Sequence, residues 1–262
     1  MKNKNSQGLF KNTGNRLGRK VYISPKNSDL ELLGYGRVVL NGKTKPVVVK
    51  TGGNEFGWIC YRGTAVIKVD GQEYKLNRYD ILYVPRDCRV ELGTSSSVDL
   101  IECSAPADLK TAVTVVRFAE IKAGTKYHSI AGQPPCQREI FKLIDDNVPA
   151  RRLLAGVTFS QPGSLTSWPP HEHTKTKEEI YLYIDMPAPA FGIQMVYENN
   201  KTPEFVGVVR ENDAVVVPRG YHPNVACPGY TIGFCWLMAA KNPLTDRSWT
   251  NVNVQPEFNP AK

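Results

Sequence analysis

The sequence consists almost throughout of short apolar runs separated by turn-forming residues. The runs are rich in Val, Ile, Tyr and Phe, and the pairs Asn41-Gly42 and Asp70-Gly71 favour the positive φ angles of tight hairpins. No long stretch repeats its apolar positions with the period of an amphipathic helix. This pattern predicts an all-β sandwich or barrel. The predicted strands are residues 21–23, 35–40, 46–50, 57–61, 65–69, 80–84, 113–118, 139–143, 152–159, 179–184, 191–197, 205–209, 214–217 and 231–238.

Two segments in the two halves of the chain share one pattern. Residues 77–87 and 210–220 each contain an aspartate followed by four apolar or aromatic residues and a Pro-Arg pair. The offset between them is about half the chain length, which indicates a duplicated unit. We therefore predict two tandem β-barrels, the N-terminal one over 21–125 and the C-terminal one over 126–262, after a basic flexible tail over 1–20.

Charge and cysteine usage exclude several classes of protein. Of the net charge of +8, six positive charges lie in the first twenty residues, which contain no acid, so the remainder carries only +2. That distribution favours a solubilising tail over a nucleic-acid-binding surface. No apolar run approaches the length of about 20 residues that a membrane span requires, and the polar N-terminus does not resemble a secretory signal. The six cysteines form no Cys-x-x-Cys pair, so we expect free thiols and a cytoplasmic protein.

Three of the four histidines fall into two short motifs, Trp-Pro-Pro-His-Glu-His at 168–173 and Val-Pro-Arg-Gly-Tyr-His-Pro at 217–223. Residues i and i+2 of a strand share a face, so His171 and His173 can direct both imidazoles to one point. Each histidine alone would also fit a hydrogen-bonded structural side chain, but together with His222 they indicate a metal site. Only the C-terminal copy can hold this site, because the first copy has Arg89 in place of His222 and no histidine precedes His128.

These motifs resemble the cupin superfamily, whose small β-barrels bind a divalent metal through three histidines and one glutamate. More narrowly, residues 135–240 resemble the 5-deoxy-glucuronate isomerase family, a bicupin family of bacterial inositol catabolism related to the 5-keto-4-deoxyuronate isomerases of pectin breakdown. Besides the two histidine motifs, the resemblance rests on Glu-Glu-Ile-Tyr at 178–181, Cys-Pro-Gly-Tyr at 227–230 and Gln-Arg-Glu-Ile at 137–140. One departure from the general cupin pattern is Asn212, which stands where a glycine usually opens the second motif. In a second departure, shared with the isomerase family, His222 follows Gly220 by two residues rather than three.

The resemblance implies a bicupin of two tandem jelly-roll β-barrels with one divalent ion, Zn, Fe or Mn, in the C-terminal barrel. The implied ligands are three histidines and one glutamate: His171, His173, His222 and either Glu178 or Glu179. In cupins the ligating glutamate directly precedes an apolar and aromatic strand. Strand alternation places Glu179 on one face with Tyr181 and Tyr183, and Glu178 on the other. We therefore favour Glu179.

The resemblance also implies an aldose–ketose isomerase that converts 5-deoxy-glucuronate into 5-dehydro-2-deoxy-gluconate in myo-inositol catabolism. An ion held by neutral imidazoles and one carboxylate remains a Lewis acid, suited to the charge that develops when a proton leaves the carbon beside a carbonyl. A general base returns that proton to the neighbouring carbon. The candidates for proton transfer are Tyr183 and Glu178. The candidate substrate contacts are Tyr221, Gln194 and, for the carboxylate, Arg219, with Arg138 and Arg152 as alternatives.

Other activities fit the same ligands. One is an isomerase of another uronate, such as 5-keto-4-deoxyuronate. Another is a metal-dependent cupin dioxygenase, which would need a redox-active metal and O₂. A non-catalytic sugar-binding cupin is the third, although the intact set of histidines argues against it. The expected partner is a small uronate, with no nucleic acid or membrane, and association through sheet edges would give a homo-oligomer.

Overall fold

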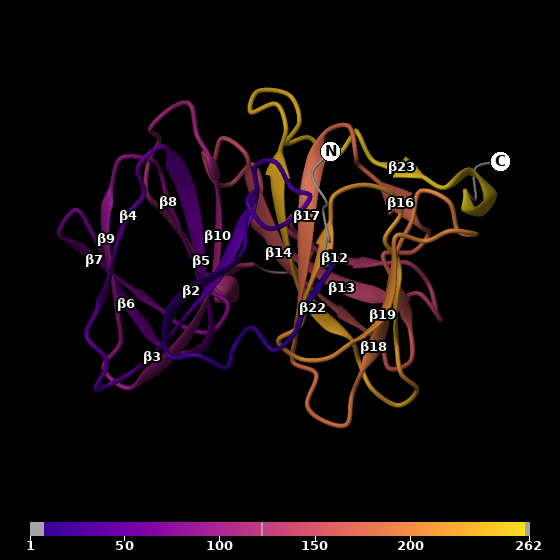
Figure 1. Cartoon of the computed structure of the whole chain (residues 1–262), viewed down its shortest axis with the longest axis horizontal. Coiled ribbons are helices and arrows are strands. Elements are labelled where there is room, and N and C mark those ends of the chain that lie inside the picture. Colours follow the sequence, from indigo (N-terminus) through magenta and orange to yellow (C-terminus); the bar gives the residue numbers. More distant parts are fainter. Residues whose placement is uncertain (1–7, 122, 260–262) are drawn as a thin grey trace.

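The computed structural model describes residues 8–121 and 123–259, and this part of the chain is built from antiparallel sheets with no α-helix. The all-β prediction is therefore confirmed. Figure 1 shows the first half of the chain in violet beside the second half in orange and yellow. No helix in the described residues is long and apolar enough to cross a membrane.

Each half has one large and one small sheet. The large sheet of the first half has the strand order β11 (Thr114–Val116), β8 (Ile81–Val84), β5 (Asn54–Gly63), β10 (Ser97–Pro106), β3 (Gly34–Asn41) and β2 (Gly18–Ile23). Its small sheet has the order β4 (Val47–Lys50), β9 (Arg89–Gly93), β6 (Ala65–Val69) and β7 (Gln72–Leu76).

The large sheet of the second half has the order β1 (Leu9–Phe10), β20 (Ala214–Val217), β17 (Lys177–Ile184), β22 (Gly233–Ala240), β14 (Leu153–Ser160), β13 (Arg138–Ile144) and β12 (His128–Ala131). Its small sheet has the order β15 (Leu165–Thr166), β21 (Asn224–Ala226), β18 (Gly192–Val196) and β19 (Phe205–Val209). A two-stranded sheet joins β16 (His171–Glu172) to β23 (Asn253–Val254), and two 3₁₀ turns, η1 (Phe118–Glu120) and η2 (Pro256–Phe258), complete the elements.

The sequence repeat corresponds to a repeat in strand order. The series β8-β5-β10-β3-β2 of the first half matches β20-β17-β22-β14-β13 of the second, and the two small sheets match strand for strand. The repeated aspartates also make the same turn. Asp80 Oδ2 accepts the Asn77 N–H at 3.0 Å, and Asp213 Oδ2 accepts the Arg210 N–H at 3.0 Å. Both turns are fixed by a side chain that bonds to its own preceding backbone.

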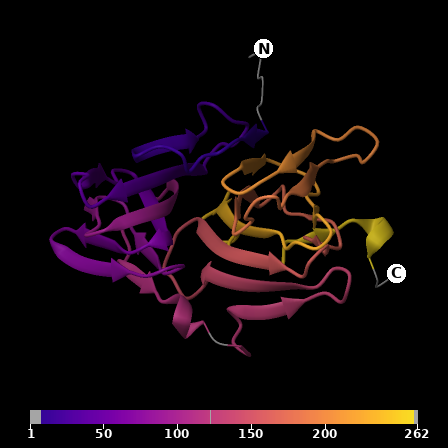
Figure 2. The ribbon, with the colours of Figure 1, turned by 90° about the horizontal axis from the view of Figure 1, so that it is seen from below.

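The N-terminal segment differs from the flexible tail predicted over 1–20. Residues 1–7 lie outside the described part, but β1 pairs with β20 and thereby extends the sheet of the second half. It occupies the position that β11 occupies beside β8 in the first half. Figure 2 shows this indigo segment running from one half to the other. The sequence missed it because two paired residues give no periodic signal.

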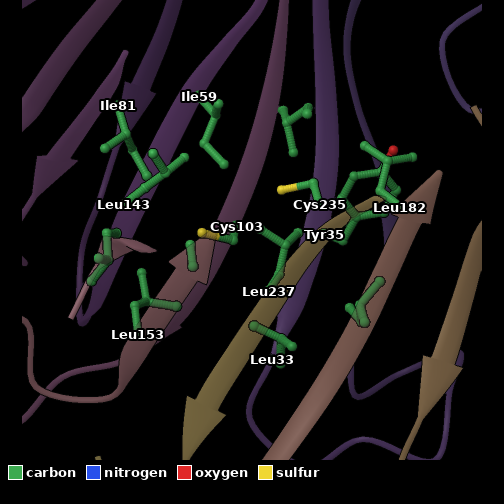
Figure 3. Packing of buried hydrophobic residues seen from close by; sticks show 14 of the residues in the cluster. Leu33, Tyr35, Ile59, Ile81, Cys103, Leu143, Leu153, Leu182, Cys235 and Leu237 are labelled. Carbon is green, nitrogen blue, oxygen red and sulfur yellow. The ribbon is translucent and has the colours of Figure 1, made fainter. Parts of the chain in front are cut away.

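Three apolar clusters order the sheets into four layers. The cluster in Figure 3 lies between the two large sheets, where Ile59 and Cys103 of the first half pack with Leu153, Leu182 and Leu237 of the second. A second cluster fills the space between the two sheets of the first half, and a third does so in the second half. All six cysteines are free thiols, as predicted, and five of them are buried.

Two buried carboxylates join the halves reciprocally. Glu178 on β17 accepts three backbone N–H groups from the first half, those of Glu31, Leu32 and Leu33, at 2.6, 3.0 and 3.0 Å. In return, Glu55 on β5 accepts the N–H groups of residues 151, 152 and 153 at 2.7, 2.6 and 2.8 Å. Each carboxylate satisfies backbone donors that the other half would otherwise bury unpaired.

Replacing Glu178 by alanine should therefore lower the free energy of unfolding by about 3 kcal/mol, because it leaves buried backbone donors without an acceptor. Urea unfolding measures this loss. Glu73→Ala, on the exposed face of β7, is the matched control and should change stability by less than about 0.5 kcal/mol. Equal stability of the two variants would show that the Glu178 carboxylate does not hold the halves together.

Candidate metal centre

Three side chains predicted as ligands meet inside the second half. The potential ligand atoms of His173, Glu179 and His222 all lie within 4.8 Å of one another, and all three residues are buried. The Oε2 atom of Glu179 is 3.0 Å from His173 Nε2 and 3.2 Å from His222 Nε2. His171 lies beside this group, with its ring centroid 4.8 Å from that of His222. The cluster therefore unites segments that are about fifty residues apart.

The alternation of β17 selects between the two glutamates. Ile180 and Leu182 face the first half with Glu178, whereas Tyr181 and Tyr183 belong to the apolar cluster inside the second half. Glu179 lies on the inner face and reaches the histidines. The choice of Glu179 is geometrically supported, and Glu178, predicted as a candidate catalytic group, is on the wrong face of the strand. Its carboxylate is already saturated by backbone N–H groups.

Backbone carbonyls orient all three imidazoles. The Nδ1 atoms of His171, His173 and His222 lie 3.2, 3.4 and 2.9 Å from the carbonyl oxygens of residues 169, 177 and 220. A carbonyl oxygen can only accept, so each Nδ1 carries the hydrogen. In this tautomer Nε2 is the atom that would bind a cation, which is the usual arrangement of metal-binding histidines. In the absence of an ion, His173 Nε2 is hydrogen-bonded to Glu179 Oε2 at 3.0 Å.

Local backbone geometry places His222. Gly220 has a φ of 80°, and a Cβ atom there would lie 2.5 Å from the Tyr197 carbonyl oxygen, so a side chain would be both strained and obstructed. Its N–H donates to Thr174 Oγ1 at 2.9 Å and thereby ties the two histidine motifs together. Asn212, the departure from the cupin pattern, adopts a φ of 68°, which asparagine tolerates better than most residues.

The C-terminal segment supports His171, a contact that no local sequence pattern predicts. His171 pairs with Val254 across β16 and β23, and the Gln255 N–H donates to the Pro170 carbonyl at 2.8 Å. The buried Gln255 side chain accepts the Tyr197 hydroxyl at 2.8 Å. A segment near the end of the described chain thus fixes the histidine that lies outside the group of three.

The protonation states of the cluster suit a cation. Burial alone would raise the pKa of Glu179, but the hydrogen bond from His173 and the charge of the two nearby imidazoles lower it to about 2. Burial, reinforced by the neighbouring imidazoles, lowers the pKa of His171 to about 3, so this ring is neutral. Burial lowers the pKa of His222, but the Glu179 carboxylate, 3.2 Å from its Nε2, outweighs this and raises the pKa. The proton on His222 and a metal ion compete for the same Nε2 atom.

An unpaired atom shows that a cation fits this cluster. Among the described residues, Oε1 of Glu179 is buried and has no hydrogen-bond partner. Buried carboxylate oxygens are normally paired, because leaving one unpaired costs free energy. A set of imidazole nitrogens with one carboxylate oxygen is suited to divalent transition metals. The described residues therefore contain a candidate His/Glu metal site.

A pocket of about 300 Å³ opens beside the cluster. Its walls combine aromatic, apolar, hydroxyl and cationic side chains: Tyr181, Phe234, Trp236, Trp249, Ile140, Met238, Val252, Ser129, Thr158, Ser167, Arg138 and Lys142, with His171 and Glu179. Gly156 makes room for one wall, since a Cβ there would lie 2.0 Å from Trp236 Cζ2. Apart from the ligand candidates His171 and Glu179, the only residue of this wall that the sequence predicts as a substrate contact is Arg138. The other wall residues come from many separate strands.

Two residues predicted to act on the substrate, Tyr183 and Gln194, support the backbone at His222 instead of lining the pocket. Tyr183 is fully buried, and its hydroxyl donates to Gln194 Oε1. The Gln194 Nε2 atom donates to the carbonyl oxygens of His222 and Pro223 at 3.0 and 3.2 Å. Neither side chain lines the pocket. The predicted catalytic role of Tyr183 and substrate contact of Gln194 therefore do not fit this geometry, and both side chains position His222.

The predicted substrate contacts near Gly220 also lie outside the pocket. Arg219 is exposed, and its Nε is 3.0 Å from Glu198 Oε2. Tyr221 packs on Tyr197, with ring centroids 5.7 Å apart. Neither belongs to the pocket wall, because the chain turns between Pro218 and His222 and directs them outward. Arg152, one of the alternatives, donates to the carbonyl of Ala240 at 2.9 Å and is also absent from the wall.

Comparison with known proteins shows that nearly the whole chain matches one family. The sequence model of the KduI/IolB family matches residues 9–259. A 5-deoxy-glucuronate isomerase of Geobacillus kaustophilus is 27% identical over 242 residues, covering 86% of each chain. A 4-deoxy-L-threo-5-hexosulose-uronate ketol-isomerase of Caldicellulosiruptor bescii is 29% identical, covering 77% of this chain and 71% of that protein.

Solved structures show the same fold. The crystal structure of an IolB-like protein from Salmonella typhimurium superposes with a TM-score of 0.85 at 22% identity, covering 97% of this chain and 98% of the other. A cupin 2 conserved barrel domain protein from Leptotrichia buccalis superposes with a TM-score of 0.53 at 12% identity, covering 88% and 92%. The fold is therefore all-β and cupin-like.

Replacing Tyr183 by phenylalanine should lower the free energy of unfolding by about 1 kcal/mol, because the buried Gln194 oxygen loses a donor. Urea unfolding of the variant and the parent protein measures the difference. Tyr221→Phe is the matched control, because the Tyr221 hydroxyl makes no hydrogen bond among the described residues. If the Tyr183 variant were as stable as this control, the Tyr183 hydroxyl would not support the backbone at His222.

Proposed function

The chain belongs to the KduI/IolB family, and we propose on that basis that it is an isomerase interconverting the aldose and ketose forms of a uronate. The observation that carries the proposal is a pocket that joins a buried His/Glu cluster to cationic and hydroxyl side chains. The substrate we propose is 5-deoxy-glucuronate, with 5-dehydro-2-deoxy-gluconate as product, the reaction of myo-inositol catabolism. The alternative is another uronate, such as the 4-deoxy-L-threo-5-hexosulose-uronate of the second relative's name.

The proposed architecture is a bicupin of two tandem jelly-roll barrels over residues 21–125 and 126–262. The matching strand orders of the two halves and the equivalent aspartate turns support it. The inside of the first half is filled by apolar side chains such as Trp58 and Ile67, whereas the second half opens into the pocket. This difference supports the proposal that the site belongs to the C-terminal barrel. The free, mostly buried thiols fit the cytoplasmic location that we propose.

The residues that would hold one divalent ion, Zn, Fe or Mn, are His171, His173, Glu179 and His222. When bound there, the ion would act as a Lewis acid that withdraws charge from the substrate's oxygen atoms. Three carbonyl groups hold the imidazole tautomers that such binding requires. The Gln194 amide fixes the backbone at His222.

The protein's own contribution at the reacting end is a wall of hydroxyl and aromatic groups. The Tyr181 hydroxyl lies 2.8 Å from Ser167 Oγ, and its ring centroid is 5.6 Å from that of His222. Burial raises the pKa of the Tyr181 phenol well above its usual value, so the hydroxyl keeps its proton and can donate a hydrogen bond to a substrate oxygen. Trp236 and Trp249, whose rings meet edge to face at 5.7 Å, form an apolar wall that excludes water.

The amount of bound metal shows which of the two adjacent glutamates, Glu178 or Glu179, is the ligand. The Glu179→Gln variant should lose most of its bound divalent ion, because an amide oxygen is a weaker ligand than a carboxylate. The Glu178→Gln variant, whose side chain lies on the opposite face of β17, should retain about one ion per chain. Elemental analysis of the dialysed proteins measures both. Loss of metal from the Glu178 variant alone would reverse the assignment.

Anaerobic turnover tests the reaction class. With the metal-loaded protein and 5-deoxy-glucuronate, ¹H NMR should show the aldehyde signal disappear as the ketose forms, with no oxygen present, because an isomerisation involves no net redox change. Prior removal of the metal with a chelator should stop the conversion, and adding a divalent ion back should restore it. Conversion that requires O₂ would indicate a dioxygenase instead. Binding without conversion of either uronate would indicate a sugar-binding protein.

A further inference from the structure

We infer that Arg138 binds the substrate's carboxylate group and thereby makes this pocket selective for acidic sugars. This inference rests on the proposed uronate isomerase function and assigns the residue that recognises the acid. The sequence had offered three arginines for this role, and the structure leaves one of them in the pocket.

Arg138 is the first residue of β13, and its side chain shares a strand face with Ile140 and Lys142. All three line the pocket. The guanidinium Nη1 donates to the Cys136 carbonyl at 3.2 Å, and no carboxylate pairs with it among the residues that the structure describes. A guanidinium has five N–H donors, so most of its hydrogen-bonding capacity is unused. Burial lowers the pKa of Arg138, which indicates a group partly removed from water.

The other cation of the pocket wall is already engaged. Lys142 Nζ lies 3.2 Å from Asp145 Oδ2 and 4.9 Å from the centre of the Trp249 ring. An anion arriving at Lys142 would compete with that carboxylate. At Arg138 it would meet an uncompensated positive charge, and bidentate pairing of a guanidinium with a carboxylate is both strong and directional.

Arg138 and the cluster approach one pocket from different strands of the same sheet. In the order β17-β22-β14-β13, three strand spacings separate the strands of Glu179 and Arg138. Along the strands, Arg138 lies opposite Ser160, six residues from Leu154 in the row of Glu179. Both side chains point into the pocket, and the charge of Arg138 acts on the Tyr181 phenol. Because Arg138, His171 and Glu179 line the same pocket, a substrate with its carbonyl end at the cluster can present its carboxylate to Arg138.

The pocket should therefore bind a neutral sugar of the same length more weakly than the sugar acid. Its primary alcohol would replace the carboxylate and leave the guanidinium without a counter-charge. A site whose polar groups are left unpaired by an analogue rejects that analogue strongly. The aromatic walls contact both sugars equally, so the discrimination depends on Arg138.

The test compares metal-loaded wild-type protein with Arg138→Gln, Arg138→Lys, Lys142→Gln and Arg219→Gln. Two readouts are needed: KM and kcat for 5-deoxy-glucuronate, and binding of D-glucuronate against D-glucose by calorimetry. Arg138→Gln should raise KM and weaken glucuronate binding by about 10- to 100-fold, with glucose binding unchanged. Arg138→Lys, which keeps the charge but loses the paired donors, should fall between this variant and wild type. Arg219→Gln, exposed and outside the pocket, should match wild type.

The outcomes separate the inference from the function on which it rests. If wild type isomerises the uronate and Arg138→Gln keeps the wild-type KM and glucuronate preference, the inference is overturned and the function stands. The same conclusion follows if Lys142→Gln alone loses the preference. If wild type binds glucuronate through Arg138 but isomerises no uronate, the arginine assignment stands and the function fails. Should Arg138→Gln fail to fold, an unchanged KM in Arg138→Lys would overturn the inference.

Discussion

The site depends on the alternation of one strand that is buried on both faces. β17 is hydrogen-bonded to β20 on one side and β22 on the other, so its register cannot shift without breaking both ladders. Two consecutive glutamates therefore have opposite tasks. Glu178 points towards the first half and accepts three of its N–H groups, while Glu179 points into the second half, to the histidines. A shift of one residue would bury a carboxylate in the wrong layer and dismantle both functions.

The first half of the chain contributes to the site without lining the pocket. Its large sheet packs against that of the second half, and its segment at 31–33 saturates Glu178. The segment before it supplies β1, which completes the edge of the second sheet. Because Glu55 makes the reciprocal contact with 151–153, the two sheets are joined at two places in their interface. The first half, which contains no histidine, thus acts as a scaffold for the half that holds the cluster.

The sequence predicted the parts of this protein that depend on local pattern. Strand alternation put Glu178 and Glu179 on opposite faces, the resemblance to cupins favoured Glu179, and the histidine motifs pointed to the cluster. The parts that depend on distant partners were missed. β1 and β23 have two residues each, too few for any periodicity, and they exist only because β20 and His171 lie opposite them. Arg219 was named for the substrate carboxylate by residue type, but it lies outside the pocket, where its Nε is 3.0 Å from Glu198 Oε2.

We propose that three histidines and Glu179 surround one divalent ion in this pocket. X-ray absorption on the zinc-loaded protein tests this arrangement, because the spectrum reports the ligand atoms themselves. The expected spectrum shows nitrogen and oxygen neighbours at about 2.0–2.2 Å with the multiple scattering of imidazole rings, and an altered shell in a His171→Ala variant. Sulfur neighbours at about 2.3 Å, or a shell without imidazole scattering, would contradict it.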